Sequence, residues 1–406
     1  MDAVCDRVTH VTPVGSLRRF DATVGDISLL AVTSSATALF DALEATSGLK
    51  ILRRDPTARV VEFERDRVTL HTTPPDAAGA ALLYHTGARG HVVELVRRAE
   101  ARRLQIGPDG VQALHTHEFV HAQSEEQVYG LLGLPFIAPE LREGQGEIEA
   151  AEAGALPTLL ERRDIRGDLH MHSTWSDGRD DIEAMVKQSL ALGYEYVAIT
   201  DHSQSSGGAG GLTAARLERQ RHEIDEVRRR VPGIEILHGS EVDILPDGSL
   251  DYPDAVLAEL DIVLASLHDQ AGQGGSRLTD RYLGAIQHPL VNVITHPTNR
   301  LVGHRPGYDL DFSRLFEAAA ETGTVLEIDG APAHLDMDGA LARRAIEAGV
   351  MVAVDSDCHR AEWLDRQMTF GVATARRGWA EARHVLNTRA LSEVRAIFER
   401  KKKWRD

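Results

Sequence analysis

The sequence contains little cysteine, few aromatic residues and no long apolar run. Its two cysteines, Cys5 and Cys358, exclude a disulfide framework, so a reducing compartment is expected. No run approaches the roughly 18 apolar residues of a membrane span, and the N-terminus lacks the basic-then-apolar pattern of a secretion signal. The chain is therefore expected to be cytoplasmic and to contact no membrane.

The sequence also lacks an excess of basic residues. Its formal net charge is −17 at pH 7, and residues 1–165 and 166–406 are each acidic. The strongly basic surface that usually accompanies tight nucleic-acid binding is therefore absent, although local clusters of arginine occur at 53–67 and 97–103. Such clusters are most simply interpreted as solvated faces.

What the sequence does contain is one pattern repeated seven times in residues 166–406. A short β-rich run is followed by a polar turn and, in most units, by a helical stretch. This alternation predicts parallel strands with right-handed crossovers, and seven units predict a TIM-like α/β barrel with its site at the C-terminal strand ends. The predicted strands are 166–172, 196–202, 235–243, 262–268, 291–296, 324–329 and 351–357.

Residues 1–165 predict a smaller α+β region. The polar stretch 144–155, rich in Gly, Ala and Glu, indicates a linker that ends before the first barrel strand. In the α+β region we expect strands at 27–32, 59–63 and 67–71 and helices at 36–44 and 92–104.

Metal-binding residue types stand at the ends of six predicted barrel strands. Residues i and i+2 of a strand share a face, so His170 and His172 can hold one ion together, and Asp357 and His359 have the same spacing. Glu241 is the acid with this placement in the middle strands, which suits it to bridge two ions. The other candidates are His202, His268 and His296.

These ligands are too many for a single four-coordinate ion, so two or three divalent ions are expected. Nitrogen and carboxylate donors without thiolates favour Zn, Mn or Fe over Ca or Mg. Closely spaced ions of this kind clamp a phosphate, lower the pKa of a bound water and stabilise a leaving oxygen. Phosphoester hydrolysis is the best-matched chemistry, and amide hydrolysis is the competing one. The predicted catalytic residues are His170, His172, His202, Glu241, His268 and Asp357.

Two further groups of residues are candidates for supporting roles. Arg300, His304 and Arg305 follow the fifth predicted strand, where they could contact substrate phosphates. Asp201 and Asp329 could orient ligand histidines from a second layer.

Residues 166–406 resemble a polymerase and histidinol phosphatase (PHP) domain. The segments that carry the resemblance are 168–178, 199–203, 239–241, 266–268, 294–298 and 355–359. It implies a distorted seven-unit (β/α)7 barrel with up to three metal ions. The implied ligands are His170, His172, Asp177, His202, Glu241, His268, His296, Asp357 and His359.

Residues 1–165 resemble the palm and thumb of a bacterial family X DNA polymerase. The matching segments are 15–19, 23–27, 84–87 with His91, 129–135, 139–143 and 146–149. The resemblance implies four regions in order: 1–80 palm-like, 81–143 thumb-like, 144–165 linker and 166–406 PHP barrel.

The palm departs from the family pattern where polymerase chemistry needs carboxylates. Aspartates are expected on both sides of Ile27, but Ser28 follows it, and Thr69 stands where a third aspartate is expected. Neutral hydroxyls cannot replace two anionic ligands of the Mg ions that nucleotidyl transfer requires. The family's N-terminal helix-hairpin-helix region is also missing before the palm. The palm is therefore predicted to be degenerate, with polymerase activity lost.

The leading functional prediction is a metal-dependent phosphoesterase that acts at DNA 3′ ends. The resemblance implies 3′–5′ exonuclease or end-processing activity, because bacterial family X polymerases associate this domain with it. The alternatives are a small-molecule phosphomonoesterase of the histidinol-phosphatase type and a non-catalytic DNA-end binding module. The expected partners are DNA ends or a small phosphorylated substrate, and the oligomeric state stays open.

Overall fold

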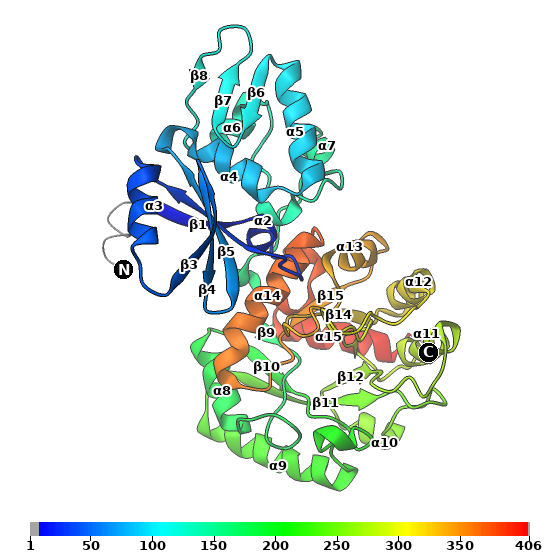
Figure 1. The fold of residues 1–406 in the computed structure, drawn as a ribbon. Helices are drawn as coiled ribbons and strands as arrows, with labels where there is room; N and C mark the ends of the chain where they lie inside the picture. The colour runs from blue at the N-terminus through cyan, green and yellow to red at the C-terminus, as the bar shows by residue number, and fades with distance from the viewer. Residues whose placement is uncertain (1–7, 405–406) are drawn as a thin grey trace. The chain divides into compact units, whose positions relative to one another are not determined.

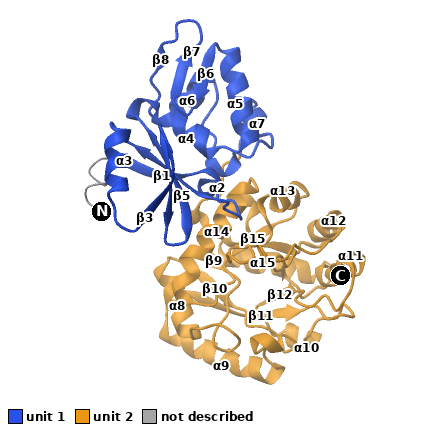
Figure 2. Ribbon diagram, in the orientation of Figure 1, with its two compact units in different colours: residues 1–156 blue, residues 157–406 orange. Residues whose placement is uncertain are grey.

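A computed structural model of the chain describes residues 8–404, so Cys5 lies outside the described part. The chain divides into two compact units, residues 1–156 and 157–406 (Figure 2). None of the described helices is both long enough and apolar enough to cross a membrane.

The second unit is built on seven parallel strands in the order β15-β14-β13-β12-β11-β10-β9 (Figure 1). The sheet follows the chain order, as the repeated strand–helix pattern predicts. Its strands are β9 (Gly167–Asp168), β10 (Tyr196–Ile199), β11 (Glu235–Asp243), β12 (Ile262–Ser266), β13 (Val293–Ile294), β14 (Val325–Asp329) and β15 (Val352–Asp355). Its helices are α8 (Ile182–Ala191), α9 (Ala214–Arg230), α10 (Asp254–Leu257), α11 (Gly275–Ile286), α12 (Phe312–Thr322), α13 (Gly339–Glu347), α14 (Leu364–Arg377) and α15 (Leu391–Lys402).

The barrel closes between its first and last strands by side chains rather than by a continuous ladder. The Asp355 carboxylate accepts the N–H of Leu169 at 2.8 Å, and the Asp168 carboxylate accepts the N–H of Ser356 at 3.2 Å. Beyond them, Met171 and Cys358 form an isolated parallel bridge. This seam explains why β9 is shorter than the predicted strand 166–172.

The interior of the barrel is apolar at one end and polar at the other. Residues such as Leu237, Leu264 and Val325 form a buried cluster, and α15 completes it with Val394 and Phe398. Further along the same strands the inward positions become Glu241, His268 and Glu327, all polar. Because every second residue of a strand faces inward, the same face of each strand contributes to the hydrophobic core at one end and to the functional site at the other.

The first unit combines a five-stranded sheet, in the order β1-β2-β5-β4-β3, with a three-stranded sheet, β6-β7-β8. Its strands are β1 (His10–Val14), β2 (Ile27–Val32), β3 (Leu49–Asp55), β4 (Ala58–Phe63), β5 (Asp66–Thr73), β6 (Leu104–Gly107), β7 (Gly110–Ala113) and β8 (Phe119–Val120). Its helices are α2 (Gly15–Arg18), α3 (Ala36–Glu44), α4 (Ala78–Thr86), α5 (Arg89–Ala101), α6 (Glu125–Leu131) and α7 (Glu147–Glu152).

Two predicted boundaries in this unit need correction. The helix expected at 92–104 is α5, which ends at Ala101 because Arg103 adopts a left-handed conformation with φ of 60°. The stretch expected as a linker contains α7, and its Glu147 is buried against His91, with Oε1 2.6 Å from Nδ1 of that histidine.

Buried charges hold the thumb-like part of this unit together. Arg142 has no exposed surface and donates to the carboxylate of Glu125 and, at 2.8 Å, to the carbonyl of Ile137. Arg18 binds the same carboxylate with two nitrogens, at 2.9 and 2.6 Å. Charges buried in this way depend on their partners, so the pairs fix how α6 packs.

Candidate metal centre

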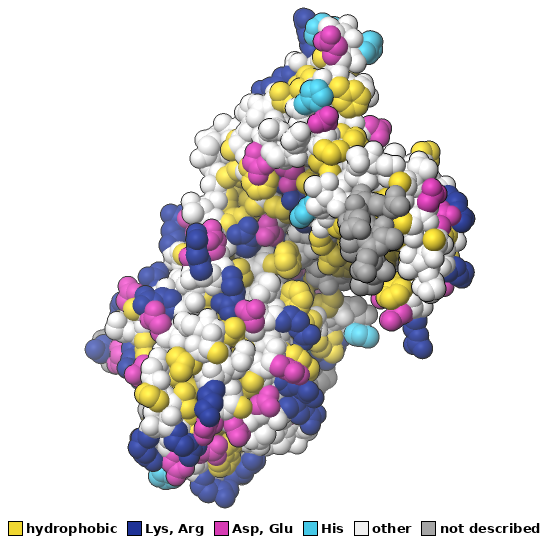
Figure 3. All heavy atoms as spheres, turned by 90° about the vertical axis from the view of Figure 1, so that its left-hand side faces the viewer, with side chains coloured by type: hydrophobic (Ala, Val, Ile, Leu, Met, Phe, Trp, Pro, Cys, Tyr) yellow, Lys and Arg dark blue, Asp and Glu magenta, His cyan; other side chains and the backbone are white. Residues whose placement is uncertain are grey.

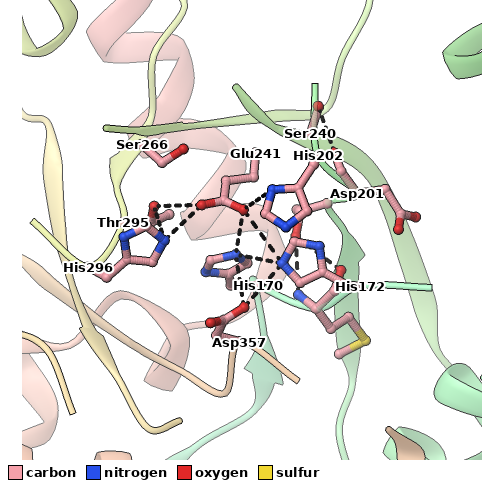
Figure 4. Close-up of polar contacts among 12 residues, drawn as sticks. His170, His172, Asp201, His202, Ser240, Glu241, Ser266, Thr295, His296 and Asp357 are labelled. Atoms are coloured by element: carbon pink, nitrogen blue, oxygen red, sulfur yellow. Dashed lines mark hydrogen bonds and ion pairs between the residues drawn. The ribbon is translucent and has the colours of Figure 1, made fainter. Parts of the chain in front are cut away.

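The predicted ligands converge at the polar end of the barrel, and Figure 4 shows six of them: His170, His172, His202, Glu241, His296 and Asp357. Eight of the nine form three groups in which one donor atom per residue lies within 4.8 Å of the others, a spacing that could hold metal ions. The groups share His172 and His202, so the three positions adjoin. They are His172–Asp177–His202–His359, His170–His172–Asp357 and His202–Glu241–His268.

Glu241 lies at the middle of the centre and His296, the ninth predicted ligand, reaches it. Oε1 of Glu241 lies 2.8 Å from Nε2 of His296 and 3.3 Å from Nε2 of His268. Its Oε2 lies 2.8 Å from Nδ1 of His202. One buried carboxylate with imidazoles at both oxygens has the geometry that a bridging ligand requires.

Two of the site residues leave the regular strand conformation. Val293 and Thr295 both face the interior of the barrel, because alternate residues of a strand share a face. In a regular strand the next residue, His296, would face outward. His296 has a left-handed φ of 25°, which lets its ring reach Glu241, and Asp357 has a left-handed φ of 47° after β15. Such conformations cost energy and persist where surrounding contacts hold them, as is common at functional sites.

Carboxylates and a carbonyl fix the ring orientation of three of the histidines. Nδ1 of His170 lies 2.7 Å from Oε1 of Glu327, and Nδ1 of His268 lies 2.7 Å from Oδ1 of Asp243. Nδ1 of His359 lies 2.9 Å from the carbonyl oxygen of Asp357. Because each acceptor requires a proton on Nδ1, the neutral rings present unprotonated Nε2 atoms to the centre, as metal ligands do.

The polar atoms inside the centre fit bound cations. Oε2 of Glu241 is buried, and Nδ1 of His202 lies 2.8 Å from it. Nε2 of His170 and Nε2 of His172 each lie 3.6 Å from this oxygen and 3.1 Å from one another. A buried carboxylate oxygen with three imidazole nitrogens within 3.6 Å of it suits a divalent metal, and nitrogen and carboxylate donors agree with Zn, Mn or Fe.

Without ions, the acidic groups make the exposed imidazoles bind protons. Burial opposes protonation of His268, but Glu241 and Asp243 outweigh it and raise the pKa of His268 to about 10. Burial also opposes protonation of His359, where Asp177 and Asp357 raise the pKa to about 9. Ions bound here must therefore displace protons.

The ligand histidines are oriented by residues that were not predicted from the sequence. Asp201 was expected to orient a histidine, but its carboxylate instead accepts hydrogen bonds from Ser173, Ser176 and Gln220. Asp329 accepts from the N–H of Ala331 rather than from a ligand ring. Glu327 and Asp243 hold the rings instead. Both lie on inward positions of predicted strands, two residues from Asp329 and Glu241, and that spacing was the signal available.

The three predicted substrate residues differ in their availability. The guanidinium of Arg300 donates to the carbonyl oxygens of His334 (2.9 Å) and Leu335 and to Asp338. This arginine therefore braces a loop with these donors. Arg305 is exposed and donates with one nitrogen to Asn299, at 2.7 and 2.8 Å. His304 is exposed beside it.

The palm-like sheet of the first unit places the substituted residues side by side. Ser28 on β2 pairs with Thr69 on β5 in the parallel ladder. The Ser28 hydroxyl donates to Asp26 at 2.8 Å, and Asp26 is exposed. A single carboxylate with two hydroxyls stands where the polymerase pattern calls for three carboxylates.

Comparison with protein families agrees with this architecture. Residues 168–328 match the PHP domain, and residues 81–143 match the DNA polymerase beta thumb. The PHP segment contains all the predicted ligands except Asp357 and His359, and the thumb segment contains the ion pair of Arg142 and Glu125.

Individual relatives extend the likeness over the whole chain. The chain is 39% identical over 400 residues to the "DNA polymerase/3'-5' exonuclease PolX" of Bacillus subtilis, which covers 97% of this chain and 70% of that protein. It is 32% identical over 204 residues to a probable phosphatase of Thermoanaerobacter sp., covering 47% of this chain and 78% of the relative. A probable phosphatase of Syntrophotalea carbinolica is 31% identical over 166 residues, with 40% and 64% covered.

The PHP match and these relatives identify the barrel as a phosphoesterase, a hydrolase of phosphoester bonds. The likeness to PolX spans the palm-like and thumb-like segments as well as the barrel. The chain therefore belongs to the PolX family of bacterial family X DNA polymerases, with a PHP phosphoesterase barrel as its C-terminal unit.

Proposed function

We propose that this protein is a cytoplasmic, metal-dependent nuclease that shortens or processes DNA 3′ ends and that its polymerase activity is lost. The observation that carries the proposal is the occurrence, in one chain, of a complete set of predicted metal ligands and a palm that retains one carboxylate of three. The name of the Bacillus relative, which includes 3′-5′ exonuclease, supports the choice of substrate.

The proposed metal ligands are the nine named above, in the three adjoining groups. Bound divalent ions would supply a water of lowered pKa and would stabilise charge on the phosphate. The protein's own groups position that chemistry. Glu327 and Asp243 hold His170 and His268 in the ligand tautomer, and Glu241, between His202 and His296, would be a ligand shared by neighbouring ions.

Substrate is expected to approach from the side where the centre is open. The side chains of Asp177, His268 and His359 are 37%, 34% and 29% exposed, whereas those of His170 and His172 are fully buried. Arg305 stands on a neighbouring loop with exposed guanidinium donors, which suits a phosphodiester oxygen.

The face of the described residues drawn in Figure 3 shows no broad basic footprint for DNA. On the face drawn in Figure 3, basic and acidic side chains are interspersed among the described residues. We therefore propose that the protein holds a DNA end through a few contacts near the metal centre, with correspondingly modest, salt-sensitive affinity.

The test is digestion of a 5′-labelled oligonucleotide in Mn, with wild type beside the His170→Ala/His172→Ala variant. The expected result is a ladder of 3′-shortened products that disappears in the variant. Asp26→Asn serves as a matched control, because it alters a carboxylate of the palm and leaves the barrel untouched. A ladder that persists in the double-histidine variant would show that another site performs the cleavage.

A second candidate is a small-molecule phosphomonoesterase, which the similarity to probable phosphatases and the net charge of −17 favour. An assay of the same preparation with phosphorylated alcohols as substrates distinguishes the nuclease from the phosphomonoesterase. Hydrolysis of the small substrate without any shortening of DNA would replace the nuclease proposal. Salt-sensitive DNA binding with neither activity would instead support a binding module.

A further inference from the structure

One histidine beside the metal centre belongs to none of the predicted ligand positions. The ring of His334 stacks on the ring of His296, with centroids 5.5 Å apart and an interplanar angle of 25°. His296 in turn contacts Glu241 at 2.8 Å. His334 therefore lies at one end of the centre, in the second layer of rings, and its side chain is half-buried.

The loop that carries His334 is braced on the loop after β13. Arg300 donates to the carbonyl oxygens of His334 and Leu335, and Asp336 accepts from the backbone and hydroxyl of Thr298 at 2.9 and 2.8 Å. Leu335 adopts a left-handed φ of 44° within this turn. So many contacts on one short segment hold the imidazole in a fixed place.

The hydrogen bond made by this ring determines which nitrogen is free. Nδ1 of His334 lies 3.0 Å from the carbonyl oxygen of Arg300, and a carbonyl only accepts, so Nδ1 carries the proton. In the neutral ring, Nε2 is then an acceptor, and none of the described residues donates to it.

An acceptor at this place selects the kind of group that it can contact. Phosphate oxygens are acceptors themselves and cannot bind Nε2. Amino groups on the bases differ from one nucleotide to the next. The donor shared by every unmodified DNA 3′ end is the terminal 3′-hydroxyl.

We propose that Nε2 of His334 accepts a hydrogen bond from the 3′-hydroxyl of the terminal nucleotide and so selects hydroxyl-ended DNA. This inference rests on the proposed action at DNA ends. His334 is a substrate-contacting specificity residue and not a metal ligand. Its ring is positioned by Arg300 and His296, and its contact sets which ends enter the centre.

The experiment pairs a change in the protein with a change in the substrate. Removal of the first nucleotide is measured for an oligonucleotide ending in a 3′-hydroxyl and for the same oligonucleotide ending in a 3′-deoxy sugar. The enzymes are wild type, His334→Phe, which keeps an aromatic ring on His296, and His334→Gln, which restores an acceptor. Bound metal is counted in all three.

Loss of the substrate hydroxyl is expected to reduce kcat/KM of wild type about tenfold, which is the effect of losing one hydrogen bond. The same change in substrate should reduce kcat/KM of His334→Phe by less than about twofold. His334→Gln should recover part of the discrimination, and the metal content should not change. Equal discrimination by wild type and His334→Phe would overturn the inference. So would loss of bound metal from His334→Phe, since it would make the residue part of the centre.

Failure of the proposed function gives a different result from failure of this inference. If wild type leaves DNA intact but hydrolyses phosphomonoesters, the nuclease proposal fails. The same comparison is then made with glycerol 3-phosphate and propyl phosphate. If wild type discriminates between these two substrates and His334→Phe does not, the proposed hydroxyl contact holds for a small substrate. If His334→Phe discriminates as wild type does, the proposed contact is overturned as well.

Discussion

Glu327 joins two ligand positions of the barrel through its two carboxylate oxygens. Oε1 lies 2.7 Å from Nδ1 of His170, and Oε2 accepts the backbone N–H of His296 at 2.7 Å. Glu327 has no exposed surface. The carboxylate therefore sets the tautomer of one ligand and supports the left-handed backbone of another.

Replacing Glu327 by Gln should weaken metal binding by about 10- to 100-fold, because the ring of His170 loses its anionic partner while the volume of the side chain is kept. Metal retained after dialysis against a graded chelator measures the effect. Glu317→Gln, on the exposed part of α12, is the matched control. Equal metal retention by Glu327→Gln and wild type would show that the contact does not support the centre.

Metal binding should release protons near neutral pH. In the metal-free protein the pKa of His268 is raised to about 10 and that of His359 to about 9, so both rings hold protons at pH 7 that a metal must displace. Affinity should therefore rise with pH up to about 10, the pKa of His268. Calorimetry in two buffers of different ionisation enthalpy counts the released protons, and identical heats in both buffers would contradict the prediction.

The same raised pKa values predict how stability changes with pH. A group whose pKa is higher in the folded state stabilises that state below its unfolded pKa of about 6.5, and this contribution disappears as the pH rises through the folded value. The melting temperature of the metal-free protein should thus fall between pH 7 and pH 10. Protein saturated with metal should not show this fall, because its rings are already deprotonated.

The palm should add no nucleotide to a primer. Ser28 and Thr69 cannot supply the two missing anionic ligands, so wild type and Asp26→Asn should both give no extension with all four nucleoside triphosphates and Mg. Phosphoesterase activity should be the same in both proteins. Primer extension by wild type that Asp26→Asn abolishes would mean that one carboxylate is enough for an active palm.

Removing Glu125 should destabilise the first unit strongly. Arg142 has no exposed surface, and Glu125→Ala would leave its charge buried without this partner, at a cost of about 3–5 kcal/mol. The neighbouring Glu126→Ala, at an exposed position, should change stability by less than about 0.5 kcal/mol. The two variants are compared with wild type by urea unfolding of the full chain. Unfolding is followed by circular dichroism and by the loss of phosphoesterase activity. Equal unfolding midpoints would show that the buried pair contributes little.

The regular parts of the structure could be predicted because they depend on local patterns. The predicted strand 27–32 and helix 36–44 match β2 and α3 residue for residue, and 235–243 matches β11. Inward alternation along β11 and β12 is what places Glu241 and His268 at the same end of the barrel. The family resemblance added Asp177, which lies in a loop and has no strand period to reveal it.

The remaining features depend on contacts between distant segments. The closure of the barrel by Asp168 and Asp355 pairs residues on its first and last strands, and no local pattern indicates it. Arg300 is an arginine in the expected place, but its donors are taken by a loop that lies more than 30 residues later in the sequence. Only the three-dimensional arrangement shows which polar side chains are already bound to the protein itself.

The seam of the barrel has a consequence for the synthesis of the protein. His170 and His172 precede the seam, whereas Asp357 and His359 follow it, and the bridge between Met171 and Cys358 brings the two pairs together. A nascent chain on the ribosome cannot assemble this centre until nearly all of its residues have been translated. Truncated products that end before the last strand would therefore lack a complete phosphoesterase centre.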